Sequence, residues 1–290
     1  MNKFITLVIL CFVCNISWGK DFVKLKLHLK DFDLKGKVRF FMEPRPILED
    51  TIYHYFDENG YKIKEVKAQG NMRATQLFKH NSKGQITEWT ISYTHESHPD
   101  FLKVIKVSPL YNKNSNLIET KFAQILEKRD DEIDEDEEYL GRVVYKYDDF
   151  GNMIEKQEYQ EYQIISRDIY KYDKNNNVIE TEGFTKEITN TSQYKVTFEY
   201  NAKKKILSII NYGFGGDKIT NRQDFTYTYN KNETVREENC KYTDYNDNEN
   251  RVVLNTTKYD YDSNKNPIRL KAYRDGVLQE QIEFTIEYYK

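Results

Sequence analysis

Aromatic and polar residues alternate along most of the chain, in short runs that end at an Asp or Asn. In residues 145–148 (Tyr-Lys-Tyr-Asp) the two tyrosines are two positions apart, which places them on one face of a β-strand. The Asp that follows can accept a hydrogen bond from the backbone two residues on and so begin a turn. Residues 170–173 repeat this run. The alternation therefore predicts strands that end in tight turns.

The run belongs to a frame that occurs eight times, at intervals of 24 to 36 residues. Its second position is always Asp or Asn, its seventh is aliphatic or Met in six of the eight repeats, and its fifth is Gly in three. The frames begin at Phe56, His80, Tyr111, Tyr147, Tyr172, Tyr200, Tyr229 and Tyr261. Repetition at such a period indicates a repeat architecture with one supersecondary unit in each period.

Each frame predicts a type I turn, with Asx at the first turn position and the fifth frame residue in the left-handed region, followed by a bulged hairpin. Gly60, Gly84 and Gly151 suit that conformation, and Asn176 tolerates it. Lys204, Glu233 and Lys265 occupy the same position in other repeats. Those three repeats must either accept backbone strain or use a different loop.

One repeat is thus two antiparallel strands and two turns. We expect an all-β fold, an antiparallel β-hairpin repeat meander that forms an extended, coiled sheet across residues 51–290, after a lead-in of residues 20–50 that contains the first strand. The tight turns lie at one edge, and loops of variable length lie at the other, in residues 95–100, 130–138, 190–192, 213–217 and 246–250. A propeller would group strands in fours, whereas this unit has two.

Residues 147–154 (Tyr-Asp-Asp-Phe-Gly-Asn-Met-Ile) resemble the YD repeat of the RHS family. Residues 33–38 (Asp-Leu-Lys-Gly-Lys-Val) resemble the lead-in of small exported YD-repeat proteins of Bacteroidetes-type bacteria. The resemblance covers residues 33–290 and implies the repeat architecture. RHS proteins wrap a toxin in a shell built from much longer arrays, so eight degenerate repeats do not imply that function.

The N-terminus is typical of an export signal. Lys3 precedes an apolar run over residues 4–13, which is too short to span a bilayer, and residues 17–19 (Ser-Trp-Gly) suit cleavage after Gly19. We expect a signal peptide at residues 1–19 and export to the periplasm, the cell surface or the medium. Lipidation at Cys14 is the less favoured alternative, because Val13 is bulky for a lipobox. No membrane-spanning segment is expected after signal removal.

Composition narrows the class of partner. The chain has 24 Tyr and 16 Phe among 290 residues, which is typical of a folded, strand-rich protein rather than a disordered one. Its formal net charge is −3, and Lys and Arg are scattered among Asp and Glu, so no nucleic-acid partner is expected. Cys240 alone follows the signal peptide, and we expect it to be a half-buried strand residue without a disulfide.

The search for catalytic and metal-binding motifs finds none. His95 and His98 offer two imidazoles, whereas zinc sites use three or four ligands. Residues 130–138 hold eight carboxylates without an EF-hand pattern and are interpreted as a long solvated loop. Residues 213–216 lack the Lys-Ser/Thr of a phosphate-binding loop. We therefore expect no catalytic residue, no metal site and no cofactor, and we expect that the protein is not an enzyme.

The tyrosines at one frame position form a ladder along the predicted sheet. Tyr has an apolar body and a polar tip, so the ladder could bind a glycan or a protein, or it could pack internally across strands. Its members are Tyr147, Tyr172, Tyr200, Tyr229 and Tyr261.

The ladder favours one functional hypothesis among three. The favoured one is an exported noncatalytic β-repeat protein acting as a binding or scaffold surface for a glycan, envelope component or protein. The alternatives are an immunity or accessory protein that binds a secreted toxin, and an enzyme with an unrecognised site built from loops. Repeat stacks favour binding because they form long surfaces rather than deep pockets.

Overall fold

The computed structural model describes residues 27–45, 48–129, 132–134, 138–186, 191–213, 218–245 and 251–290. The expected signal peptide, residues 1–19, lies outside these ranges. Their regular structure consists of one short 3₁₀ helix, η2 (Leu29–Phe32), and of β-strands. No helix in the described ranges is long and apolar enough to cross a membrane.

The described strands form one sheet of 20 strands, in which sequence neighbours pair antiparallel almost throughout. The predicted all-β antiparallel hairpin meander is confirmed. The strands are β1 (Val38–Arg45), β2 (Asp50–Phe56), β3 (Lys62–Gln69), β4 (Met72–His80), β5 (Ile86–His95), β6 (His98–Tyr111), β7 (Leu117–Arg129), β8 (Glu132–Asp134), β9 (Glu138–Tyr147), β10 (Met153–Gln160), β11 (Gln163–Tyr172), β12 (Val178–Lys186), β13 (Thr191–Tyr200), β14 (Ile206–Tyr212), β15 (Ile219–Tyr229), β16 (Val235–Asp244), β17 (Val252–Tyr261), β18 (Pro267–Arg274), β19 (Val277–Glu283) and β20 (Thr285–Tyr288).

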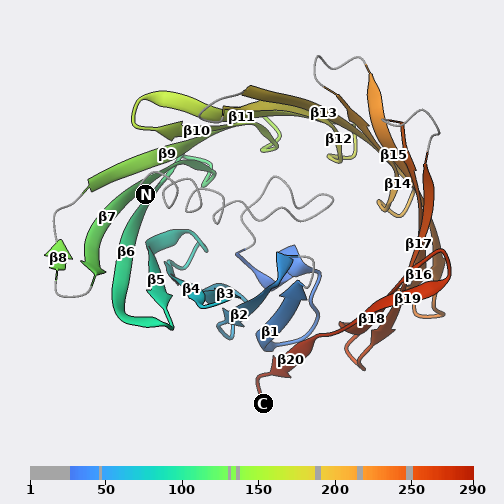
Figure 1. Cartoon of the computed structure of the whole chain (residues 1–290), viewed down its shortest axis with the longest axis horizontal. Coiled ribbons are helices and arrows are strands. Elements are labelled where there is room, and N and C mark those ends of the chain that lie inside the picture. The colour runs from blue at the N-terminus through green and yellow to red at the C-terminus, as the bar shows by residue number, and fades with distance from the viewer. Residues whose placement is uncertain are drawn as a thin grey trace.

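The two ends of the meander meet, so that the sheet curves into a nearly closed ring (Figure 1). β19 pairs with β18, and after Phe284 the chain continues as β20, which pairs with β1. In that pairing Val38 is opposite Tyr288 and Met42 is opposite Thr285. The last extended segment therefore joins the final hairpin to the first strand.

All eight frames form the same turn, and in each the fifth residue has positive φ. In the repeat that begins at Tyr147, the Asp148 N–H donates to Asn152 O (2.9 Å) and the Gly151 N–H donates to Asp148 O (3.1 Å). The φ values are 87° at Gly60, 76° at Gly84, 64° at Ser115, 81° at Gly151, 59° at Asn176, 60° at Lys204, 69° at Glu233 and 68° at Lys265. The three repeats with Lys or Glu thus use the common turn and accept its left-handed conformation.

A β-bulge follows every turn. Tyr172 pairs with Val178 and Lys171 pairs with Glu180, which leaves Ile179 as an extra residue without a partner. The same register shift occurs at the corresponding place in the other seven repeats. Bulges increase the right-handed twist of a strand pair, so their repetition helps to coil the sheet into a ring.

Alternate side chains of every strand point to the inside of the ring, where η2 also lies (Figure 1). We call this side the inner face. Along β5 and β6 it is an apolar core, in which Trp89, Ile91, Ile105 and Val107 are at most 2% exposed. Further along the ring a second core forms around Tyr170, Val178, Phe198 and Ile209.

The edge opposite the tight turns carries the connections of variable length. Residues 130–131, 135–137, 187–190, 214–217 and 246–250 of these connections lie outside the described ranges. Residues 132–134, in the middle of the acidic stretch, form β8, which pairs with Glu127, Lys128 and Arg129 at the end of β7. This stretch is therefore partly strand, because the long β7 extends beyond β9 and offers a free edge there.

Candidate functional site

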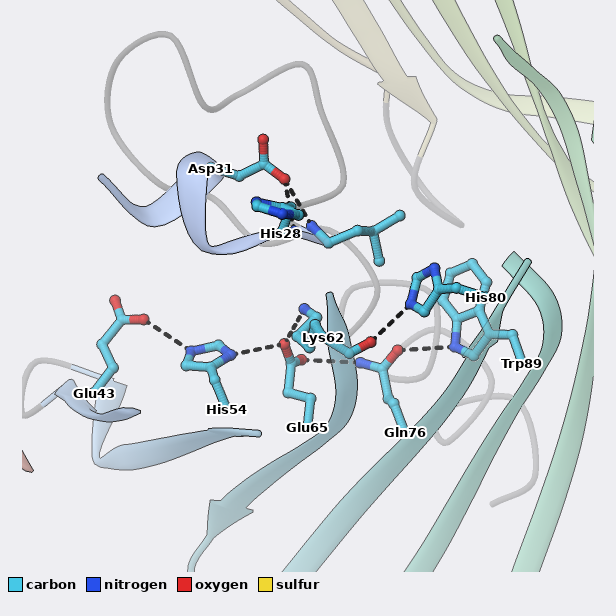
Figure 2. Close-up of polar contacts among 10 residues, drawn as sticks. His28, Asp31, Glu43, His54, Lys62, Glu65, Gln76, His80 and Trp89 are labelled. Carbon is cyan, nitrogen blue, oxygen red and sulfur yellow. Dashed lines mark hydrogen bonds and ion pairs between the residues drawn. The ribbon is translucent and has the colours of Figure 1, made fainter. Parts of the chain in front are cut away.

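A row of polar side chains crosses the inner face from β1 to β5 (Figure 2). His54 Nε2 lies 3.2 Å from Glu43 Oε2, and His54 Nδ1 lies 3.2 Å from Glu65 Oε2. Gln76 Nε2 donates to Glu65 Oε1 (3.1 Å), and the indole N–H of Trp89 donates to Gln76 Oε1 (3.1 Å). These side chains meet because His54, Glu65 and Gln76 are directly opposite one another on β2, β3 and β4.

Glu65 is the centre of this row. Its Oε2 accepts a hydrogen bond from Lys62 Nζ at 2.6 Å, and both residues are at most 3% exposed. Burial alone would raise the pKa of Glu65, but the charge of Lys62 and the contact with His54 outweigh it and hold that pKa far below its ordinary range. The pair is therefore ionised while almost fully removed from water.

The lead-in covers this part of the inner face. The Phe32 ring of η2 lies 4.7 Å from His54, centroid to centroid, and Lys62 Nζ lies 5.7 Å from the centre of the same ring. Leu29 and Leu34 pack with Phe41 and Phe56 beneath them.

Hydrogen bonds hold η2 in that place. The Asp31 carboxylate accepts the N–H groups of Leu27 and His28 at the start of the helix (Figure 2). The Leu29 N–H donates to Gly60 O (2.9 Å) and the Lys62 N–H donates to Leu27 O (2.7 Å), which joins the lead-in to the sheet.

His54, Lys62 and Glu65 are buried beneath the lead-in, whereas Glu43 at the end of the row is 35% exposed. The buried members therefore help to hold the lead-in on the sheet.

One sign of this row is visible in the sequence. Lys62 occupies the seventh frame position, which is aliphatic or Met in six of the eight repeats. A charged residue at a core position requires a buried partner of opposite charge. Glu65 and His54 could not be recognised as its partners before the strand register was known.

A second polar cluster lies on the inner face of β10 to β13. The hydroxyl of Tyr194 donates to Asp168 Oδ1, and the hydroxyl of Tyr170 donates to Asp168 Oδ2 (3.3 Å). Lys156 is directly opposite Asp168 on the neighbouring strand. Gly183 lies between Asp168 and Tyr194 in register, and a Cβ there would come within 3.0 Å of the Tyr194 hydroxyl. The absence of a side chain at Gly183 thus provides the space through which the Tyr194 hydroxyl reaches the Asp168 carboxylate.

Electrostatics keep both phenols of this cluster protonated. Burial raises the pKa of Tyr170 and that of Tyr194, and the negative charge of Asp168 raises both further. Each phenol therefore remains a hydrogen-bond donor to the Asp168 carboxylate at physiological pH. The cluster can fix polar groups in place, but its acceptor and its donors already satisfy one another.

All five ladder tyrosines lie on the inner face beside the tight turns. Three of them form a hydrogen bond from their own repeat to the preceding one. The hydroxyls of Tyr147, Tyr172 and Tyr261 donate to the backbone oxygens of Leu117 (2.8 Å), Met153 (2.6 Å) and Val235 (2.8 Å). Each acceptor is the seventh frame residue of the preceding repeat. These tyrosines therefore have a structural role in which the polar tip is already used.

The other two ladder members differ. Burial raises the pKa of Tyr200 to about 12, and its ring packs against the core around Phe198. The Tyr229 hydroxyl is buried and has no hydrogen-bond partner among the described residues, and Lys203 Nζ lies 4.2 Å above the ring. Its place as an inter-repeat anchor is taken by Tyr227, whose hydroxyl donates to Ile206 O at 2.8 Å.

The histidine pair and the cysteine singled out in the sequence do not form part of a larger group of reactive side chains among the described residues. The rings of His95 and His98 lie 4.9 Å apart across the β5–β6 connection, and Glu96 between them pairs with Arg73 (2.6 Å). Cys240 is a half-buried residue of β16, as expected, and burial raises its pKa to about 11. Within the described ranges no three His, Cys, Asp or Glu side chains are grouped so as to hold a metal ion.

Comparisons with known proteins give a limited result. No family model matches the chain, and no curated protein matches it. Among solved structures it is similar to TcdB2-TccC3, with a TM-score of 0.35 and 12% identity over 81% of this chain, although it spans only 15% of the length of that chain.

Two solved porin-like proteins from Bacteroides are also similar. The one from Bacteroides uniformis has a TM-score of 0.33 and 12% identity, over 88% of this chain and 98% of that one. The one from Bacteroides vulgatus has a TM-score of 0.30 and 10% identity, over 87% and 98%. Likenesses at these scores show neither a family nor a function.

Proposed function

We propose that this protein is an exported, noncatalytic β-repeat protein of the small YD-repeat type, and that the inner face of its later strands binds a glycan, an envelope component or another protein. Support comes from the difference between the two halves of the inner face. Trp89 and Ile105 in the early strands are at most 2% exposed, whereas Phe225, Tyr227 and Tyr229 on β15 are only half-buried. The later strands thus present aromatic surface that is only partly covered.

The observation that carries the proposal is a row of half-buried aromatic rings on β15 that ends at Tyr229. The Tyr229 ring continues the row of Phe225 and Tyr227, with neighbouring centroids 6.5 Å apart, while its buried hydroxyl has no partner in the described residues. Buried polar groups are nearly always hydrogen-bonded, so this hydroxyl lacks an expected partner. The hydroxyl itself is closed to solvent, so a ligand would pack a sugar ring or an apolar side chain on the half-buried rings of this row.

Single substitutions at two ladder positions test this function. Tyr229→Ala should weaken binding of a hit from a glycan array by about tenfold or more, because aromatic anchors at binding surfaces often contribute about 2 kcal/mol. Its circular dichroism spectrum should be unchanged. Tyr147→Ala is the matched control, since that tyrosine bridges repeats, and it should lower the melting temperature instead. Unaltered binding in Tyr229→Ala, or no hit on glycan and envelope-fraction arrays, would contradict the proposal.

Export is a separate part of the proposal. Mass spectrometry of the protein purified from its native host should find Lys20 at the mature N-terminus. A diacylated N-terminal Cys14 would instead show a lipoprotein.

A further inference from the structure

One side of β19 is left unpaired by the described strands of the sheet. β19 pairs with β18, and no described strand pairs with its other side. The chain continues from β19 into β20, and β20 pairs with β1 through the side that β19 leaves unpaired. This β1–β20 pairing extends only from Val38 to Met42 of β1. The sheet is therefore open between β19 and the end of β1 that lies beyond Met42.

The backbone of β19 shows which groups are unpaired. The Phe284 N–H donates to Ile268 O (2.9 Å), so Phe284 directs its backbone groups to β18. Alternate residues of an antiparallel strand direct these groups to opposite sides. Gln281 and Glu283 therefore direct their N–H and C=O groups away from β18, to the open side.

The two strands beside the opening differ in how they are protected. Proline is tolerated in a sheet where its nitrogen faces a free edge, and Pro44 lies on β1 just past the end of the β20 pairing. Pro and Lys are common means of blunting an exposed edge. β19 (Val-Leu-Gln-Glu-Gln-Ile-Glu) contains neither, and its Val277 and Leu278 are 64% and 50% exposed. β19 is thus the receptive edge.

The charges on β19 indicate what would pair with it. Neighbouring strands of this sheet repeatedly place Lys opposite Glu, as in Lys146–Glu155 (2.7 Å) and Lys171–Glu180 (2.5 Å). Both charged residues of β19, Glu280 and Glu283, are acidic, and no ion pair with a base is found for either within the described residues. Glu280 and Glu283 are three residues apart and therefore lie on opposite faces of the strand. A strand added at this edge would match it best with Lys or Arg at two positions three residues apart, one on each face, and apolar residues between them.

We propose that the β19 edge binds, by β-strand addition, an extended segment of a partner protein in which two basic residues lie three positions apart among apolar residues. The segment pairs with the free N–H and C=O groups of Gln281 and Glu283 and places its bases beside Glu280 and Glu283. Backbone hydrogen bonds supply affinity and the alternate side chains supply specificity in this mode of recognition.

A seven-residue peptide with Lys at positions 2 and 5 and Val elsewhere, labelled with fluorescein, is the probe, and fluorescence anisotropy is the readout. Gln281→Pro removes one free-edge N–H without touching the ladder to β18 and should weaken binding at least tenfold. Gln281→Ala keeps that N–H and should bind within twofold of the wild type. Replacing both Glu280 and Glu283 by Lys should transfer the preference to a Glu-Val peptide of equal length.

A second measurement does not depend on how the variants fold. Methylation of alternate peptide nitrogens in the probe should abolish binding in one register and leave it intact in the other, because only one side of the peptide faces β19. Equal binding of the Lys-Val and Glu-Val peptides, equal loss in both methylated registers, or no binding to the wild type would overturn the proposal. A dimer of this protein that Gln281→Pro dissociates would also overturn it, since the edge would then serve a second copy.

Discussion

Glu65 and Lys62 form an ion pair where the sequence pattern alone would place an apolar contact. Removing two charges from water costs several kcal/mol for each ion, and their attraction compensates only when the geometry is good and the other polar atoms are satisfied. Here the Glu65 carboxylate also accepts a hydrogen bond from the Gln76 amide and lies 3.2 Å from His54 Nδ1. The Lys62 ammonium lies 5.3 Å from the centre of the Phe78 ring. The arrangement fixes one register among β2, β3 and β4.

Glu65→Gln should destabilise the protein by about 3–5 kcal/mol, because it leaves Lys62 buried without a counter-charge. Urea unfolding at pH 7 measures the difference. Glu88→Gln, whose partner Lys79 is exposed, is the matched control and should cost less than about 1 kcal/mol. A similar cost for both variants would show that the buried pair has no special contribution.

The low pKa of Glu65 in this ion pair makes the stability of the fold depend on pH in the acid range. The pKa of Glu65 is lower in the folded protein than in the unfolded chain, so the unfolded state binds more protons in acid. The stability that Glu65 contributes is therefore complete above about pH 4.3 and declines as the pH falls further. Urea unfolding between pH 3 and pH 6 should show a shallower acid decline in Glu65→Gln than in the wild type. Parallel pH profiles would refute this.

The ladder allows a comparison between hydroxyls that have partners and one that has none. Tyr147→Phe, Tyr172→Phe and Tyr261→Phe each remove a hydrogen bond to a backbone oxygen and should cost about 1 kcal/mol. Tyr229→Phe removes a buried hydroxyl without a partner and should be neutral or stabilising in the absence of ligand. Denaturant unfolding of the four variants measures this order, and a loss at Tyr229 equal to the others would show that its hydroxyl is bonded.

At the scale of the hairpin, one turn geometry persists although its preferred residue is often missing. The Asx side chain of seven of the eight frames accepts backbone N–H groups, as Asp173 Oδ1 does from Asn175 and Asn177 (2.8 Å each). In the remaining frame the Asn230 amide donates to Thr234 Oγ1 (2.9 Å). Hydrogen bonding of this kind stabilises the turn independently of the residue at its fifth position. The conserved element of the frame is therefore the Asx and not the glycine.

Lys204→Gly, Glu233→Gly and Lys265→Gly should each stabilise the protein by up to about 1 kcal/mol, because glycine adopts their φ of 60° to 69° without steric cost. Gly151→Ala, at a φ of 81° with open space around a new Cβ, should be destabilising for the same reason. Thermal unfolding checks both directions. Lys203→Gly, one position earlier in the turn, is the control and should give no gain.

At the scale of the whole molecule, the pairing of β20 with β1 turns the curved sheet into a nearly closed ring. Twist accumulates along a long sheet, and eight bulges add to it, so the two ends of the meander approach each other. The contact is made by residues far apart in the chain, since Phe284 and Ile286 of the final segment pack on the cluster around Phe41.

A disulfide across the seam tests this closure. Met42 and Thr285 are opposite in register, and antiparallel partners have Cα atoms about 4.5–5.5 Å apart, which suits a disulfide. In a Cys240→Ala background, Met42→Cys with Thr285→Cys should oxidise readily and stabilise the protein by about 3–5 kcal/mol in denaturant. Met42→Cys with Glu287→Cys is out of register and should oxidise slowly. Free thiols in the first pair would show that the seam is open.

Local chemistry made the repeating hairpin predictable. The Asx at the second frame position, the aromatic before it and the aliphatic residue at the seventh position act within a few residues of one another, so their effect is visible along the chain. In repeats without glycine, propensity alone does not decide whether the fifth frame residue, such as Glu233, accepts the left-handed conformation or a different loop forms. The neighbouring hydrogen bonds of the turn decided it.

The ladder was predicted only in part. The sequence placed Tyr147 and Tyr229 at one frame position, yet one hydroxyl anchors the preceding repeat and the other has no partner among the described residues. That difference depends on where the previous strand runs relative to each ring. Sequence spacing does not contain this information.

By itself, the sequence determined the class of fold, the position of each tight turn and the alternation that separates the two faces, because all three follow from contacts between residues close in the chain. Only the tertiary structure decided that the ring nearly closes through β20, that Lys62 is paired with Glu65 beneath η2, and that no described strand pairs with the second side of β19. These features depend on strand register and on accumulated twist, and both are sums of small contributions from every hairpin. A register shift of one residue would move every inner side chain to the outer face, so such contacts exist only once the whole sheet is assembled.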